Sequence, residues 1–141
     1  MSADRPVYVL DSYDVLAYLG DEPGGGRVRS ILEAAAEDRC RIALSVINLG
    51  EIAYIIERER GLASAQAALA ALDLLPVEVV PATTEAVLSA AHVKAQHPMA
   101  YADALVVATA LALGGIVVTG DPGFAAVGDL VRIEWLPQAA D

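Results

Sequence analysis

Residues 7–11 read Val7-Tyr8-Val9-Leu10-Asp11, an apolar run that ends on an acidic residue. A short apolar run without alternating polar residues is typical of a strand buried on both faces of a parallel sheet. Three further runs and a weaker one have the same character: Arg41–Leu44, Val77–Val80, Ile116–Thr119 and, more weakly, Leu130–Ile133. Ligands of such sheets bind beyond the carboxyl ends of the strands, so the residues after each run are the first candidates for function.

Segments of helical length separate these strands, mostly in pairs: Ser12–Leu19, Arg27–Glu37, Val46–Arg60, Ala63–Leu72, Glu85–Ala95 and Ala100–Leu113. Ser45 and Thr83 are suited to cap the helices that follow them. Gly61 and the pair Gly114-Gly115 are suited to end helices. The alternation of strands with helix pairs predicts an α/β domain of three layers with a central parallel sheet flanked by helices.

The chain has 141 residues, and single domains cluster at about 100–150 residues. We therefore predict a single domain over residues 1–141. The one cysteine, Cys40, excludes an internal disulfide. The first residues lack the apolar core of a signal peptide, and the longest apolar run, Met99 to Leu113, is too short to span a bilayer. We expect a cytoplasmic protein without a membrane partner.

The chain is strongly acidic, with 19 acidic and 9 basic residues and a net charge of −10. Such a chain repels phosphates, so binding to nucleic acid requires bound cations or a local basic strip. Most of the arginines do lie close together in sequence, at Arg27, Arg29, Arg39, Arg41, Arg58 and Arg60. Each of them singly is typical of a solvated arginine on a helix face.

Four acidic residues stand in apolar surroundings. Asp11 and Asp121 directly follow predicted strands, whereas Glu51 and Asp103 are each the only charged residue in a long apolar helical segment. Three of them have a structural explanation: Asp11 as a helix cap, Asp103 as a first-turn acid, and Asp121 as a turn residue. Glu51 has the weakest one, because an unpaired carboxylate inside a helix is costly to bury. We expect Asp14, one helical turn after Asp11, to face solvent or to be secondary.

Taken together, the four acids are expected to converge on one edge of the sheet. Neighbouring carboxylates repel and raise one another's pKa values, so they persist best around a hard cation. Oxygen ligands suit Mg²⁺ or Mn²⁺, and His92 and His97 are wrongly spaced for joint ligation from one helix face. An acidic pocket with such a cation favours phosphoryl chemistry, in which the cation also bridges an acidic protein to an anionic substrate.

At these residues the sequence resembles a PIN domain, and specifically the VapC-type toxin ribonucleases of bacterial toxin–antitoxin modules. The matching segments occur in family order over nearly the whole chain: Val9–Ser12, Ser45–Glu51, Tyr101–Ala110 and Val118–Phe124. The resemblance implies strand order 3-2-1-4-5 around an acidic pocket. It also implies an Mg²⁺- or Mn²⁺-dependent endoribonuclease that hydrolyses RNA phosphodiester bonds with a water activated by the metal.

The resemblance further implies roles for individual residues and for partners. Asp11, Glu51, Asp103 and Asp121 match the metal-binding and catalytic acids of the family. Ser12 and Thr119 match supporting hydroxyl positions, and Asn48 is suited to reach the same site from one helical turn before Glu51. The resemblance also implies a homodimer and a cognate antitoxin that wraps the toxin and places a basic side chain in the pocket.

Other interpretations stay open at this point. The domain could be a catalytically silent PIN-like interaction module, although the intact set of acids argues against it. A nuclease of the same fold that acts on DNA is equally compatible with the pocket. A receiver domain would need a lysine after a late strand, whereas Lys94 lies in a predicted helix. The helical positions of Tyr13, Tyr18 and Tyr54 favour core or dimer contacts over platforms for RNA bases.

Overall fold

The computed structural model describes residues 5–137. Its centre is a five-stranded sheet in the order β3-β2-β1-β4-β5, in which every neighbouring pair is parallel. The strands are β1 (Val7–Leu10), β2 (Arg41–Ser45), β3 (Glu78–Val80), β4 (Ile116–Thr119) and β5 (Arg132–Trp135). The predicted fold class and the strand order 3-2-1-4-5 are therefore confirmed.

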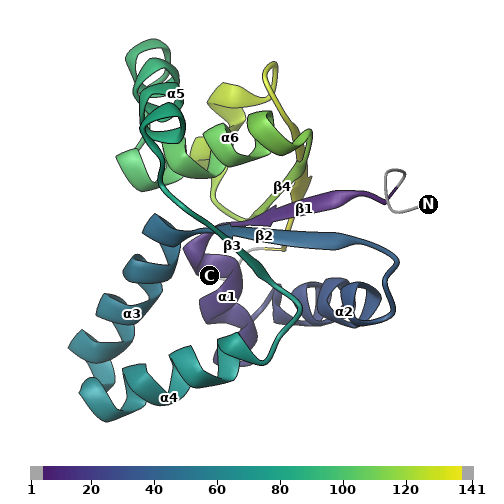
Figure 1. The fold of residues 1–141 in the computed structure, drawn as a ribbon, viewed down its shortest axis with the longest axis vertical. Helices are drawn as coiled ribbons and strands as arrows, with labels where there is room; N and C mark the ends of the chain where they lie inside the picture. The colour runs from purple at the N-terminus through teal and green to yellow at the C-terminus, as the bar shows by residue number, and fades with distance from the viewer. Residues whose placement is uncertain (1–4, 138–141) are drawn as a thin grey trace.

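Helices cover both faces of this sheet (Figure 1). They are α1 (Ser12–Leu19), α2 (Gly25–Ala36), α3 (Val46–Arg60), α4 (Leu62–Asp73), α5 (Thr84–Gln96), α6 (Tyr101–Leu113) and the 3₁₀-helix η2 (Pro122–Val127). Helices α5 and α6 lie on one side of the sheet, and α1 to α4 lie on the other. No helix of residues 5–137 has the length and apolar character needed to span a membrane.

The central strands are largely apolar, and each of their faces packs against helices. Val9 and Val117 belong to the cluster built on α6, whereas Leu10, Ile42 and Val118 belong to the cluster that includes residues of α1 and α2. Successive residues of a strand point to opposite faces, so both sets of side chains are buried. The edge strands β3 and β5 are more exposed.

The predicted helix caps form, and they mark where the chain passes from strand to helix. Ser45 and Thr83 accept hydrogen bonds from the backbone at the starts of α3 and α5. Gly114 ends α6 in the left-handed conformation, with φ of 63°. A Cβ on Gly115 would lie 2.9 Å from Cγ2 of Val9 and 3.1 Å from the Val7 carbonyl oxygen. The close approach of β4 to β1 therefore requires glycine there, and it brings the ends of these two strands together.

The prediction for the fifth strand was displaced by two residues. It placed the strand at Leu130–Ile133, whereas β5 spans Arg132–Trp135. The backbone N–H groups of Leu130 and Val131 both donate to the carbonyl of Val127, so these residues close the turn after η2. Local hydrogen bonds thus take two apolar residues away from the strand.

Candidate active site

Asp11 lies where β1 ends and α1 begins, and its side chain is buried. Its Oδ1 accepts a hydrogen bond of 2.8 Å from the backbone N–H of Asp14, as expected for a helix cap. Its Oδ2 accepts one of 2.7 Å from the hydroxyl of Thr119 at the end of β4. Burial raises the pKa of Asp11 against the opposing effect of these hydrogen bonds, and the charge of Asp121 raises it further. The structural and functional explanations for Asp11 are therefore compatible.

Of the two alternatives expected for Asp14, exposure to solvent was wrong. Its side chain is 1% exposed, and its Oδ2 accepts a hydrogen bond of 3.0 Å from the backbone N–H of Asp11. Its Oδ1 is buried without a hydrogen-bond partner. Desolvation and the charge of Asp11 hold the pKa of Asp14 well above its usual range. The signal that sequence reasoning missed was the capping box, in which the third helical residue turns back towards the cap.

Thr119 links Asp11 to Asp121. Its hydroxyl oxygen donates to Asp11 and accepts a hydrogen bond of 3.0 Å from the backbone N–H of Asp121. The Asp121 carboxylate in turn accepts a hydrogen bond of 2.9 Å from the backbone N–H of Gly123 at the start of η2. Asp121 is thus a turn residue, as its sequence context indicates, and its second carboxylate oxygen is left for other contacts.

Glu51 is tied to α1 by Ser12, whose hydroxyl donates to the Glu51 carboxylate. The same hydroxyl oxygen accepts a hydrogen bond of 3.3 Å from the side-chain amide of Asn48, which also lies 3.4 Å from the Ala102 carbonyl oxygen at the start of α6. Asn48 is completely buried, and its Oδ1 has no hydrogen-bond partner. The predicted supporting residues Ser12 and Asn48 therefore join α1, α3 and α6.

Asp103 lies in the first turn of α6 and is half-buried. Its pKa is raised to about 6 by desolvation and then by the charges of Asp121, Asp11 and Glu51, in that order. Each of the four predicted acids comes from a different segment of the chain, and the charges of the other three act on Asp103. This convergence is the main feature of the site.

The side chains of residues 5–137 are not gathered into a metal centre. No three of their Asp, Glu, His or Cys side chains lie as a group that would hold a metal ion. The donor chemistry nevertheless fits a hard cation, because it combines carboxylates under mutual repulsion with the unpartnered amide oxygen of Asn48. Asp11, Glu51, Asp103 and Asp121 stay the predicted ligands of such a cation.

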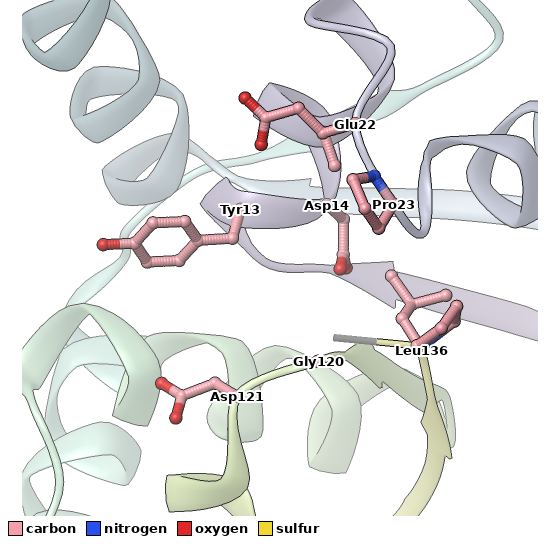
Figure 2. Close-up of a pocket in the computed structure, with 9 residues that line it drawn as sticks. Tyr13, Asp14, Glu22, Pro23, Gly120, Asp121 and Leu136 are labelled. Atoms are coloured by element: carbon pink, nitrogen blue, oxygen red, sulfur yellow. The ribbon is translucent and has the colours of Figure 1, made fainter. Parts of the chain in front are cut away.

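A cavity of about 370 Å³ opens beside these acids, between α1 and the loop after β4. Its lining combines carboxyl groups with apolar and aromatic side chains: Tyr13, Asp14, Ala17, Glu22, Pro23, Gly120, Asp121, Leu136 and Pro137. Figure 2 shows the Tyr13 ring and the Asp121 carboxylate projecting to the same side, with the Asp14 carboxyl group directed towards Gly120 and Leu136. The cavity therefore shares Asp121 with the cluster of acids.

The arginines of the middle of the chain do not form a continuous basic strip. Arg27 forms a bidentate ion pair with Glu134, and Arg41 forms one with Glu78. Another, Arg39, pairs with its neighbour Glu37. These pairs neutralise half of the positive charge that the sequence places there.

Tyr13, Tyr18 and Tyr54 are not all buried. Tyr13 is 64% exposed and Tyr54 is 53% exposed, so neither belongs to the core. Tyr54 lies under the guanidinium of Arg58, which is 5.4 Å from the ring centroid. The third residue of the set, Tyr18, packs partly buried against the core.

Comparison with known proteins places these observations in a family. The PIN domain family matches residues 8–130, which include all four acids. No curated protein matches the chain.

Several solved structures share the fold. That of VapBC2 from Rickettsia felis bound to a promoter DNA fragment has a TM-score of 0.76 at 16% identity, covering 93% of this chain and 99% of that chain. DNA-bound VapBC from Salmonella typhimurium has a TM-score of 0.74 at 22% identity, covering 92% and 97%. VapC20 of Mycobacterium tuberculosis, described as a Sarcin-Ricin loop cleaving toxin, has a TM-score of 0.68 at 23% identity, covering 92% and 99%.

Proposed function

Because the chain belongs to the PIN domain family, we propose that it is a metal-dependent endoribonuclease, the VapC-type toxin of a toxin–antitoxin pair. The observation that carries the proposal is the gathering of four carboxyl groups from four segments of the chain: Asp121, Asp11 and Glu51 lie close enough for their charges to act on the half-buried Asp103, whose pKa is raised first by desolvation and then by these charges. Such an arrangement is unfavourable in an empty site and becomes favourable around a divalent cation. The structural neighbour VapC20, described as a Sarcin-Ricin loop cleaving toxin, supports RNA as the substrate class.

In this proposal Asp11, Glu51, Asp103 and Asp121 hold Mg²⁺ or Mn²⁺ beside the scissile phosphate. When bound, the cation neutralises the phosphate, lowers the pKa of water and stabilises the leaving oxygen. The protein's own contribution is to position the acids. Thr119 fixes one oxygen of Asp11 by donating to it.

The remaining supporting contacts act on Glu51 and on α6. Ser12 donates to Glu51, so that this carboxylate is fixed relative to α1. Asn48 connects Ser12 to the first turn of α6, which carries Asp103. No protein nucleophile is required, because the attacking group is water.

The proposal includes two partners. The neighbouring structures of toxin–antitoxin complexes support a cognate antitoxin. A hollow of about 470 Å³ between α1, α3 and α4, with apolar side chains such as Leu16 and Ile55 in its wall, offers a surface for such a protein. We also propose a homodimer, as the resemblance to the family implies. Light scattering of the purified chain, alone and with the antitoxin, would measure both assemblies.

A cleavage assay tests the enzymatic part of this proposal. The purified protein, free of any partner, is incubated with total RNA or with single-stranded DNA, in Mg²⁺ or in EDTA, beside Asp11→Ala. We expect discrete RNA fragments that require both the metal and Asp11. Cleavage of DNA alone would indicate a deoxyribonuclease of the same fold. No cleavage of either polymer would favour a silent interaction module.

A further inference from the structure

The cavity beside the four acids has features that the proposed hydrolysis does not use. Its volume of about 370 Å³ lies within the range of small-molecule sites, roughly 300–1,000 Å³. Asp121 lies in its wall, so a group bound in the cavity is adjacent to the site of phosphate chemistry. Tyr13 and Asp14 also line it, although neither matches a position that the proposed mechanism needs.

Tyr13 presents a large aromatic face at this cavity. Its side chain is 64% exposed and lines the cavity, so a face of the ring is available to a bound group. It lies in the first turn of α1, the helix that Asp11 caps, so its backbone position is fixed relative to Asp11. Stacking of a nucleobase on an exposed aromatic ring is a common way of holding single-stranded RNA.

Asp14 supplies an independent observation that points to a ligand. Its side chain is 1% exposed, its Oδ1 has no hydrogen-bond partner, and its carboxyl group is directed into the cavity (Figure 2). A buried polar atom without a partner is costly, and a ligand group that hydrogen-bonds to it removes that cost. The edges of nucleobases carry such groups, whereas the apolar neighbours Ala17 and Leu136 suit the flat faces of a base.

We propose that this cavity is a nucleobase subsite, in which Tyr13 stacks on the base next to the scissile phosphate and Asp14 contacts its polar edge. The subsite rests on the proposed ribonuclease function and deepens it, because it gives the enzyme a means of choosing where to cut. Stacking tolerates every base, whereas an edge contact distinguishes among them. Tyr13 therefore sets the affinity for RNA, and Asp14 sets the base preference.

Binding measurements separate the subsite from the cleavage chemistry. The probes are four fluorescein-labelled pentaribonucleotides with phosphorothioate linkages that resist hydrolysis. Each carries one central base, A, C, G or U, between abasic positions. Fluorescence anisotropy in Mg²⁺ gives the Kd of each probe for the wild-type chain and for the variants.

Tyr13→Ala should weaken binding of all four probes by roughly 5- to 100-fold, the range measured for base stacking on aromatic side chains. Tyr13→Phe, which keeps the ring, should stay within about twofold of wild type. Tyr54→Ala is the matched control, because this second exposed ring lies away from the cavity on α3. Equal effects of Tyr13→Ala and Tyr54→Ala, or no binding of any probe, would overturn the subsite.

Asp14→Asn should change the ratio of Kd values between the preferred base and the others by about fivefold or more. Tyr13→Ala should leave that ratio unchanged. Thermal unfolding checks that Asp14→Asn is folded, and the Tyr13 variants decide the matter if it is not. Binding that depends on Tyr13 without any cleavage would contradict the proposed nuclease alone. Cleavage with binding insensitive to Tyr13 would contradict the subsite alone.

Discussion

The hydroxyl of Thr119 donates a hydrogen bond of 2.7 Å to Oδ2 of Asp11, joining the ends of β4 and β1 across 108 positions of sequence. Both residues are buried, so the contact is shielded from water. It orients one oxygen of Asp11. The Thr119 hydroxyl oxygen also accepts a hydrogen bond from the backbone N–H of Asp121. One small side chain thus fixes two of the proposed metal-binding acids relative to each other.

Thr119→Val should lower the free energy of unfolding by about 1–3 kcal/mol, because it keeps the shape of the side chain and leaves a buried carboxylate oxygen without its donor. Urea denaturation measures the change. Thr119→Ser retains the hydroxyl, so its free energy of unfolding should be closer to that of wild type. A Thr119→Val protein as stable as wild type would mean that the hydrogen bond contributes nothing net.

Asn48→Ala should also be destabilising by about 1–3 kcal/mol, because the buried amide joins Ser12 to the Ala102 carbonyl and so holds three helices together. The same change should lower the cleavage rate, since Asp103 follows Ala102 directly in α6. Loss of stability with an unchanged cleavage rate would argue that the position of α6 does not depend on Asn48.

The titration of Asp103 should make the stability of the folded protein depend on pH. Its pKa of about 6 in the folded protein exceeds the ordinary value of 3.8, so the folded state binds protons more readily than the unfolded chain. This contribution to stability is fully present below the unfolded pKa and is lost as the pH rises through the folded pKa. In EDTA, lowering the pH from 8 to about 5.5 should therefore raise the Tm.

Asp103→Asn should reduce that rise in Tm. Glu78→Gln provides the control, because the hydrogen bond from Arg41 holds the pKa of Glu78 below its usual range and thus outside the pH window measured. An identical pH dependence for wild type and Asp103→Asn would contradict the convergence of charge on Asp103.

Divalent cations should stabilise the folded chain. Mg²⁺ or Mn²⁺ at 100 times its Kd should raise the free energy of unfolding by about 2.7 kcal/mol through mass action. Glu51→Gln should diminish this gain because it removes one of the proposed ligands. A matched control is Glu57→Gln, a change of the same chemistry at an exposed position of the same helix. Equal stabilisation of both variants would contradict a role for Glu51 in metal binding.

Much of this architecture could be predicted because local signals agree with the global fold. The apolar runs of β1 and β4 and the caps at Ser45 and Thr83 are readable from neighbouring residues alone. The placement of Leu130 could not be read in this way, because its strand-like character is overridden by hydrogen bonds to Val127. Similarly, the burial of Asp14 depends on its hydrogen bond to the Asp11 backbone and on the cavity walls that the later strands supply.

The roles of the four acids stay a prediction that the fold supports through their convergence. Their isolation in apolar sequence identified them, because charges in such surroundings need a reason. The supporting network was harder to foresee. That Asn48 reaches α6 as well as Ser12 follows from the packing of α3 against α6, which no local pattern encodes.

The most direct test of the central claim is the rate of RNA cleavage in Mg²⁺ by wild type, Glu51→Gln and Glu57→Gln, each first shown to be folded by its thermal unfolding curve. We expect Glu57→Gln to cleave at the wild-type rate and Glu51→Gln to lose cleavage while remaining folded. Wild-type cleavage by a folded Glu51→Gln would contradict the claim that the converging carboxylates are the catalytic site.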